Sequence, residues 1–218
     1  MSQKVISIVI ATYNASKTIV DCLDSVRREI TSHCELIVID GNSSDNTFAL
    51  LRDRQDFIDV LVSEEDSGIY DAWNKGIERS SGDWILFLGA DDRLLKGSLE
   101  NYLIFISRKE STEYDYICGK NMYLNSDNTL IKNIGTEPKW GSMKYYMAAA
   151  HVASLHSIKL FSEVGYFSNR YKICADYELL TRKKNELKFK FIDKKIAEMR
   201  TGGMSFSLSA LIEIFLIR

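Results

Sequence analysis

Short apolar runs alternate with helical patterns through residues 5–88, and this alternation restricts the fold more than any other feature. Residues 5–11, 35–39, 58–62 and 84–88 are apolar runs, several of them rich in β-branched side chains. Runs of this kind are typical of parallel strands buried on both faces. Apolar residues recur at helical spacing between them, as in residues 69–79. The pattern predicts a βαβαβαβ series, and therefore an α/β domain with a mostly parallel sheet.

Two further helices are predicted in this part of the chain. Ile19, Leu23, Val26 and Ile30 recur at helical spacing, and Ser44 is expected to cap a helix that runs through Leu51. The alternation stops after residue 92. There the patterns predict a helix at 98–107, a hairpin of 116–124 with 129–134, strands at 152–156 and 188–192, and helices at 176–184 and 208–216.

Charge and cysteine content narrow the class of protein. The formal net charge of −2 argues against a nucleic-acid-binding protein, which usually carries a strongly basic domain or stripe. The average hides an asymmetry, because residues 35–100 carry 15 acidic and 6 basic side chains, whereas residues 182–200 carry 8 basic and 3 acidic. The four cysteines form no Cys-x-x-Cys pair, and no apolar run is long enough for a membrane span. We expect a cytoplasmic protein with reduced thiols.

Polar residues follow each of the four predicted strands. They occupy residues 12–14, 40–45, 64–68 and 89–92 and include at least five carboxylates. Ligands of open α/β sheets bind beyond the carboxyl ends of the strands, where these residues would gather. Dense carboxylates favour a hard cation such as Mg²⁺ or Mn²⁺, which would in turn accept a diphosphate. The alternative is that these side chains only cap helices and fill turns.

Five ordered segments resemble the motifs of family 2 glycosyltransferases, and they extend over nearly the whole chain. They are residues 8–14 (IVIATYN), 40–47 (DGNSSDNT), 66–77 (DSGIYDAWNKGI), 81–92 (SGDWILFLGADD) and 175–179 (ADYEL). The chain is most similar to the bacterial subgroup that assembles O-antigen, capsule or colanic acid. The resemblance implies the GT-A fold, in which a mostly parallel, Rossmann-like sheet with helices on both faces binds the nucleotide and an irregular half binds the acceptor.

The resemblance also implies how the chain is divided. We expect a single GT-A domain over residues 1–218. Residues 1–92 would form the nucleotide-sugar half, residues 93–205 the acceptor half, and residues 206–218 an amphipathic tail.

The resemblance assigns the donor side to particular residues. Tyr13 matches the position that packs near the nucleotide base. Asp91 would face the ribose, and Asp92 would bind Mn²⁺ or Mg²⁺ on the donor diphosphate. The other residues expected at the nucleotide sugar are Ala11, Thr12, Asn14, Asp40, Ser43, Asp71, Asn74, Lys75 and His151.

The resemblance assigns the catalytic base to Asp176. Its carboxylate would take the proton of an acceptor hydroxyl while that oxygen attacks the anomeric carbon, a single displacement that inverts this centre. The acceptor is expected to be a lipid-linked saccharide. Without the resemblance, Asp176 would be read as a helix N-terminal carboxylate.

Two positions depart from the usual family pattern. Gly41 stands where many members carry a second aspartate that reaches the base, which leaves the identity of the base open. Trp73 stands where many members carry arginine, so Lys75 is expected to contact phosphate instead. Trp140 is a candidate for stacking on an acceptor sugar, whereas Trp73 and Trp84 are expected in the core.

The basic segment 182–200 and the apolar stripe of the predicted C-terminal helix each have two readings. The stripe consists of Leu208, Leu211, Ile212, Phe215 and Leu216. It would pack on the domain by default, or lie on the membrane face that carries the acceptor. The basic segment is either solvated or faces anionic lipid.

Two other classes of protein compete with the enzyme. A non-catalytic sugar-nucleotide-binding or scaffold domain would share the fold, but the chain retains both Asp92 and Asp176. A nucleotidyltransferase ranks last, because residues 12–14 replace its Gly-rich basic loop.

Overall fold

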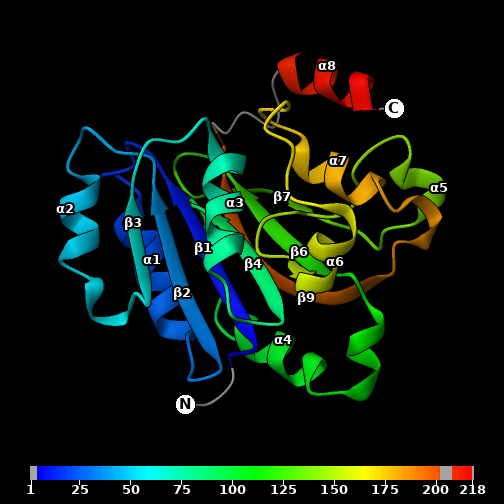
Figure 1. Cartoon of the computed structure of the whole chain (residues 1–218), viewed down its shortest axis with the longest axis horizontal. Helices are drawn as coiled ribbons and strands as arrows, with labels where there is room; N and C mark the ends of the chain where they lie inside the picture. The colour runs from blue at the N-terminus through cyan, green and yellow to red at the C-terminus, as the bar shows by residue number, and fades with distance from the viewer. Residues whose placement is uncertain (1–3, 202–207, 218) are drawn as a thin grey trace.

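The computed structural model describes residues 4–201 and 208–217 (Figure 1). The first half contains β1 (Ile6–Thr12), α1 (Ile19–Glu29), β2 (Cys34–Asp40), α2 (Thr47–Arg52), η1 (Gln55–Phe57), β3 (Val60–Ser63), α3 (Ile69–Arg79) and β4 (Trp84–Gly89). The predicted βαβαβαβ series is confirmed.

The second half mixes short helices with longer strands. It contains β5 (Arg93–Leu94), α4 (Ser98–Ile106), η2 (Lys109–Glu113), β6 (Tyr116–Leu124), β7 (Leu130–Ile134), α5 (Trp140–Met143), β8 (Leu155–Ser157), α6 (Ile158–Val164), α7 (Ala175–Thr181), η3 (Lys184–Glu186), β9 (Phe189–Arg200) and α8 (Leu208–Ile217).

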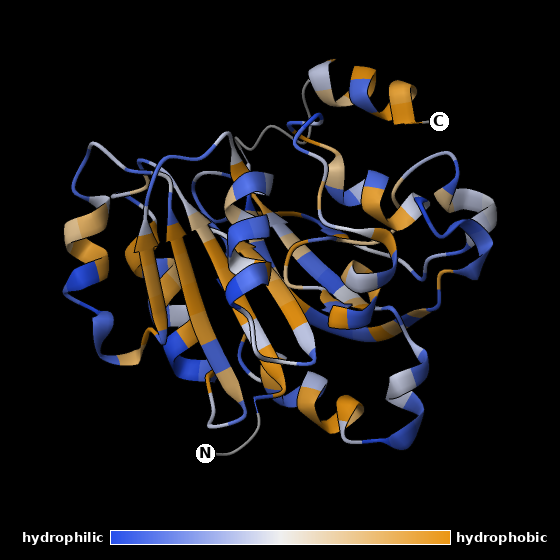
Figure 2. Ribbon diagram, in the orientation of Figure 1, coloured by the Kyte–Doolittle hydropathy of each residue, from blue (hydrophilic) through white to orange (hydrophobic). Residues whose placement is uncertain are grey.

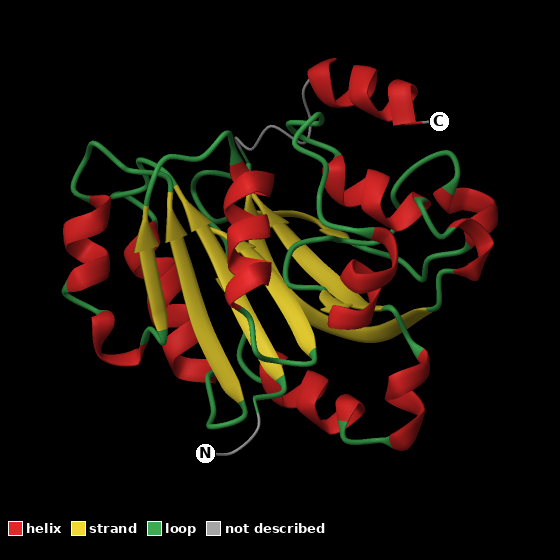
Figure 3. Ribbon diagram, in the orientation of Figure 1, coloured by secondary structure: helices red, strands yellow, loops and turns green. Residues whose placement is uncertain are grey.

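All described strands belong to one sheet, in the order β3-β2-β1-β4-β8-β6-β9-β5 with β7 paired to β6 (Figure 3). The first four strands are parallel, and β8 is antiparallel to both β4 and β6. The chain runs outward from β1 to β3 and then crosses back to β4 on the other side of β1. Ligands of open α/β sheets bind at such a switch point.

Side chains of β1 alternate between two hydrophobic cores, one on each face of the sheet. Ile6, Ile8 and Ile10 pack with α1 and α4, whereas Val9 and Ala11 pack with α3, α6 and α7. Every residue of β1, β2 and β4 is buried, and these strands are largely apolar in Figure 2. Helices on both faces of a mostly parallel front sheet confirm the predicted fold class.

Two predicted strands in the second half have the wrong bounds. The strand expected at 152–156 is the shorter β8, because Ala153 has φ 57° and ends the extended conformation. The strand expected at 188–192 continues to Arg200 as β9. Exposed Asp193, Lys194 and Lys195 interrupt the apolar pattern at a register shift, but pairing with β6 resumes and buries Ile196 and Ala197.

The start of α2 also differs from the prediction. Ser44 does not cap this helix, which begins at Thr47 without a side-chain bond from its N-cap residue Asn46. The Ser44 amide instead donates to Asn14 Oδ1 at 2.9 Å, and Asp45 Oδ1 accepts the Thr47 amide at 2.9 Å.

The four cysteines are buried free thiols. None of the helices in the described ranges is long and apolar enough to span a membrane. The expected division at residues 92 and 205 stays a prediction, and residues 202–207 and 218, which include part of the expected tail, lie outside the described residues.

Candidate active site

A cavity of about 690 Å³ lies at the carboxyl ends of β1 and β4, where the switch point was expected. Its wall comes from the end of β1 and the loop after it, from the loop after β2, from the start of α3, and from the end of β4. The lining residues are 11–18, Asp45, Asp66, Gly68, Ile69, Ala72 and 89–91. The volume falls within the range of roughly 300–1,000 Å³ that is typical of small-molecule sites.

Residues 11–14, which the resemblance assigns to the nucleotide sugar, line the cavity. Tyr13 is 64% exposed, so its ring is free to pack against a ligand. Asn14 has φ 48°, a left-handed conformation that Asn tolerates better than most residues. Its Oδ1 accepts the amide of Ser44, which ties the loop after β1 to the loop after β2.

Asp40 and Ser43 lie behind the cavity rather than in its wall. Asp40 is fully buried, and its carboxylate accepts the amide and hydroxyl of Ser43 and the hydroxyl of Ser63. Ser43 Oγ accepts the amide of Asn14 at 2.9 Å. Both side chains therefore hold the loops that form the cavity. The carboxylate of Asp40 is occupied by these hydrogen bonds and is not accessible from the cavity.

The residue that fills the space beside Gly41 is Asp66. A Cβ atom on Gly41 would lie 2.5 Å from Asp66 Oδ2. The other oxygen of Asp66 accepts the amide of Gly68 at 2.9 Å, and burial raises the pKa of this carboxyl. Asp66 lines the cavity, although the resemblance to the family assigned it no role.

The two aspartates after β4 both approach Gly89 but differ in exposure. Asp91 is exposed and lines the cavity, whereas Asp92 is 6% exposed and its Oδ2 accepts the amide of Gly89 at 3.0 Å. Burial, followed by the nearby charge of Asp91, raises the pKa of Asp92 well above its usual value. The carboxylate that faces the cavity is therefore Asp91, and Asp92 supports the turn behind it.

Asp71, Asn74 and Lys75 of α3 do not line the cavity. Asp71 accepts the amide of Ser67 at 2.8 Å, and Asn74 exchanges two hydrogen bonds with the backbone of Phe167. Lys75 Nζ donates to the carbonyl of Glu65 and lies 3.2 Å from Glu64 Oε1. These three side chains hold the loops around α3.

Asp176, the predicted base, does not line the cavity and contacts α3 through Tyr70. Its Oδ1 is 3.0 Å from the hydroxyl of Tyr70, which is also 2.5 Å from the carbonyl of Ile173. Burial, followed by the charge of Asp176, raises the pKa of Tyr70 well above its usual value, so the phenol keeps its proton and can donate it. Asp176 is 15% exposed, which leaves part of its carboxylate accessible.

His151 is brought close to Asp176, with Nδ1 3.9 Å from Oδ2. Its ring packs 5.1 Å from that of Trp73 and 5.0 Å from that of His156. Burial lowers the pKa of His151 although the charge of Asp176 opposes this, and neither ring nitrogen has a hydrogen-bond partner among the described residues. Both histidines belong to a buried aromatic cluster with Phe87 and Trp73.

The predicted tryptophans fall largely into the core. Trp73 and Trp84 are buried, as expected. Trp140 begins the short helix α5 rather than lying in a loop, and it is half-buried against the core on the α3 face.

Much of the basic segment is paired within the protein. Arg182 contacts Glu178, Lys183 contacts both Asp115 and Glu163, and Arg200 contacts Asp21. These ion pairs favour a structural role for part of the segment over a lipid-facing one.

Tyr70 and Lys17 are two site residues that the sequence analysis did not assign. Lys17 is an exposed cation in the cavity wall. It lies in the loop that follows β1, and the expectation that ligands bind beyond the carboxyl ends of the strands could have identified it. Tyr70 lies 106 positions from Asp176 in sequence, so spacing carries no signal for that contact.

Of the three carboxylates that line the cavity, those of Asp45 and Asp66 accept backbone amides, so metal binding here would rest mainly on Asp91. Among the residues that the structure describes, no group of three or more His, Cys, Asp or Glu side chains could hold a metal ion. The donor set of the cavity is nevertheless compatible with Mg²⁺ or Mn²⁺, because such ions commonly take one or two carboxylates and complete their shell with phosphate oxygens and water. Asp91 with Asp92 behind it fits that arrangement.

Comparison with known proteins decides the family. Residues 7–158 match the profile of Glycosyl transferase family 2, which extends over more than half of the chain. The chain belongs to this family. The resemblance expected from the five motifs is thus confirmed.

Several relatives are named as biosynthesis glycosyltransferases. The chain is 29% identical over 196 residues to a PGL/p-HBAD biosynthesis glycosyltransferase of Mycobacterium bovis, covering 84% of this chain and 70% of that protein. It is 28% identical over 206 residues to the amylovoran biosynthesis glycosyltransferase AmsB of Erwinia amylovora, covering 85% and 65%.

Solved structures share the fold. TarS of S. aureus, residues 1–349 in complex with UDP-GlcNAc, superimposes with a TM-score of 0.77 at 17% identity, covering 98% of this chain and 65% of that one. The mannosyltransferase PcManGT of Pyrobaculum calidifontis, in complex with GDP-Man and Mn²⁺, has a TM-score of 0.66 at 14% identity, covering 91% and 57%. The chain thus spans less than two thirds of these solved chains.

Proposed function

We propose that this chain is a metal-dependent, inverting glycosyltransferase that moves a sugar from a nucleotide diphosphate, UDP being favoured, to a lipid-linked saccharide during synthesis of a bacterial surface polysaccharide. The observation that carries the proposal is the arrangement around α3. Ile69 and Ala72 of this helix line the cavity, and Tyr70 between them contacts Asp176. One helix therefore connects a donor-sized cavity to a partly exposed carboxylate.

The donor would occupy the cavity at the switch point. Tyr13 would pack on the base, and Lys17 would lie near the phosphates. A UDP-sugar is favoured because the related fold of TarS binds UDP-GlcNAc. Asp40 and Ser43 would act through the loops they hold, since neither lines the cavity.

Asp91 would hold the cation, with Asp92 fixing the turn that presents it. The sequence assigned the metal to Asp92, and that assignment stays a prediction. We favour Asp91 because Asp92 Oδ2 already accepts the Gly89 amide. A bound Mn²⁺ or Mg²⁺ would neutralise charge on the leaving diphosphate, and PcManGT carries Mn²⁺ with its donor.

Asp176 would act as the general base. Its carboxylate accepts the proton of the acceptor hydroxyl while the hydroxyl oxygen forms a bond to the anomeric carbon. The bond from that carbon to the phosphate oxygen breaks, and the nucleoside diphosphate leaves with the electron pair. The single hydroxyl proton of Tyr70 is shared between the carbonyl of Ile173 at 2.5 Å and Asp176 Oδ1 at 3.0 Å, which would leave Oδ2 for the acceptor.

The lipid-linked acceptor is proposed from α8. The five apolar residues of its stripe are all at least half exposed, from 55% for Ile212 to 77% for Phe215, so the stripe does not pack on the domain. A helix with such a face can lie in the membrane interface. The chain would then work at the cytoplasmic membrane surface. Replacing Leu211 and Phe215 by serine should abolish sedimentation with phosphatidylglycerol vesicles, and unchanged sedimentation would contradict this part of the proposal.

The donor proposal is tested by a thermal-shift screen of UDP-, GDP- and dTDP-sugars with and without Mn²⁺. We expect one class of nucleotide sugar to raise the melting temperature, and to do so more strongly with Mn²⁺. No stabilisation of the wild type by any of them would contradict the proposed donor site. Stabilisation without turnover of any acceptor would favour the non-catalytic alternative.

A further inference from the structure

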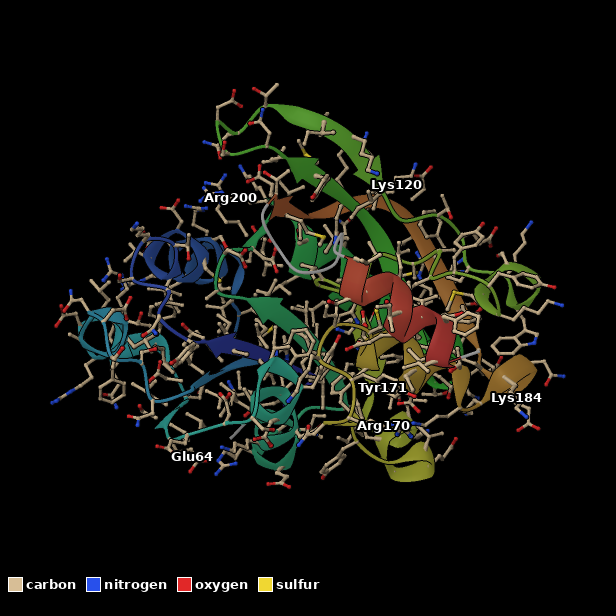
Figure 4. All side chains as sticks on the ribbon, turned by 90° about the horizontal axis from the view of Figure 1, so that it is seen from above. Glu64, Lys120, Arg170, Tyr171, Lys184 and Arg200 are labelled. Carbon is tan, nitrogen blue, oxygen red and sulfur yellow. The ribbon has the colours of Figure 1, made fainter. Side chains whose placement is uncertain are left out.

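Helix α8 packs beside the proposed base through the face opposite its apolar stripe. Ala210 is 2% exposed and packs with Cys174 and Tyr177, and Ile214 and Ile217 are half-buried around them. Figure 1 shows α8 next to α7, and Figure 4 shows it above the loop that carries Arg170 and Tyr171.

The carboxylate of Glu213 on this inner face accepts hydrogen bonds from three consecutive backbone amides. Oε1 accepts the amide of Lys172 at 2.8 Å, and Oε2 accepts those of Ile173 at 2.9 Å and Cys174 at 2.8 Å. These amides immediately precede α7, where a helix leaves N–H groups without an intrahelical partner. Hydrogen bonds to an ionised acceptor are stronger than neutral ones, so this contact fixes the segment firmly.

The same segment holds the groups around Asp176. The carbonyl of Ile173 lies 2.5 Å from the hydroxyl of Tyr70, and that hydroxyl lies 3.0 Å from Asp176 Oδ1. Asp176 itself is the second residue of α7. A shift of residues 172–174 would therefore move both the phenol that contacts the base and the helix end that carries it.

We propose that Glu213 is a positioning residue for the catalytic centre. It acts through the backbone of residues 172–174 to keep Tyr70 and Asp176 in register, and it makes docking of α8 a condition for full activity. The inference rests on the proposed function, because it takes Asp176 to be the base. It predicts that loss of the Glu213 carboxylate lowers the rate of the chemical step without changing donor binding.

The test compares Glu213→Ala and Glu213→Gln with Ser209→Ala, an exposed position at the start of the same helix. Two quantities are measured: amide hydrogen exchange across residues 170–178, and kcat and KM for Mn²⁺-dependent hydrolysis of the nucleotide sugar that the wild type hydrolyses fastest. We expect Glu213→Ala to speed exchange at 172–174 and lower kcat, each by about tenfold, while the donor KM changes less than twofold. Glu213→Gln should lose less, because its carbonyl oxygen still accepts, and Ser209→Ala should match the wild type.

The inference is overturned if Glu213→Ala leaves exchange unchanged, or speeds exchange but leaves kcat unchanged. Glu213→Gln preserves the shape of the side chain, so unfolding of both variants would assign Glu213 to the fold and also overturn it.

Asp176→Asn in the same assay separates the two proposals. Equal hydrolysis by Asp176→Asn and wild type contradicts the base assignment, whereas an inactive Asp176→Asn beside a fully active Glu213→Ala contradicts only the role of Glu213. If the wild type hydrolyses no nucleotide sugar, the proposed function loses support and the exchange data alone decide whether Glu213 holds the loop.

Discussion

The two sides of the candidate site are built in different ways. The cavity side consists of loops that directly follow adjacent parallel strands and bond to one another, as Asn14 does with Ser44. The base side is assembled from elements far apart in sequence, since Tyr70, Ile173 and Glu213 all contribute to the surroundings of Asp176. The proposed donor cavity therefore follows from the topology of the sheet. The position of the proposed base depends instead on packing between elements far apart in sequence.

The strongest test of the base side is Asp176→Asn. The amide cannot take up the acceptor proton, so we expect transfer or donor hydrolysis to fall by about 10³-fold, within the range that general bases contribute. Donor binding should change little, because Asp176 does not line the cavity. Rates of nucleoside diphosphate release measure the first effect, and retained turnover would move the role of base to another residue.

On the cavity side, the sharpest comparison is Asp91→Ala against Asp92→Asn. If Asp91 holds the cation, its loss should weaken Mn²⁺-dependent donor binding by more than about 100-fold, and Asp92→Asn should cost about tenfold as a supporting residue does. Thermal shifts with the nucleotide sugar and Mn²⁺ rank the two variants. The opposite ranking would restore the assignment of the metal to Asp92.

Tyr70→Phe tests the connection between the two sides. Removing the hydroxyl leaves the ring packed near Trp73 but takes one donor from Asp176. We expect a loss of about tenfold in kcat, equivalent to one hydrogen bond, with the donor KM unchanged. Trp73→Phe, which alters the same cluster without touching Asp176, is the control. A change in KM alone would place Tyr70 with the donor.

The smallest effect concerns stability and the buried histidine His156. Burial lowers its pKa well below the usual value, so at acidic pH the unfolded chain binds a proton that the folded chain does not. Stability should therefore be lost as pH falls below about 6.5, at about 1.4 kcal/mol per pH unit for each such histidine. Urea unfolding of His156→Phe between pH 5 and 7 should show a shallower slope than wild type. An equal slope would assign the titration to other groups.

The first half of the fold and the location of the cavity could be predicted from sequence for a physical reason. Apolar runs of fixed period define buried parallel strands, and the residues after them must meet at one edge. The end of β9 could not be predicted, because exposed charges at 193–195 interrupt its apolar pattern and long-range pairing with β6 extends it.

The orientation of individual side chains was also beyond reach of the sequence. Asp91 and Asp92 are adjacent and chemically identical, and only the backbone turn at Gly89 decides which one is buried. Tyr70 contacts the proposed base directly and Glu213 contacts the backbone next to it, and in both cases the partners lie far apart in sequence.

We propose that the donor cavity and the base Asp176 are separate sites connected by α3. Calorimetric titration of the stabilising nucleotide sugar with Mn²⁺ into wild type, Asp91→Ala and Asp176→Asn tests it most directly. We predict that Asp176→Asn binds the donor as the wild type does while Asp91→Ala shows no measurable heat of binding. Undiminished binding by Asp91→Ala, or loss of binding in Asp176→Asn, would contradict the account.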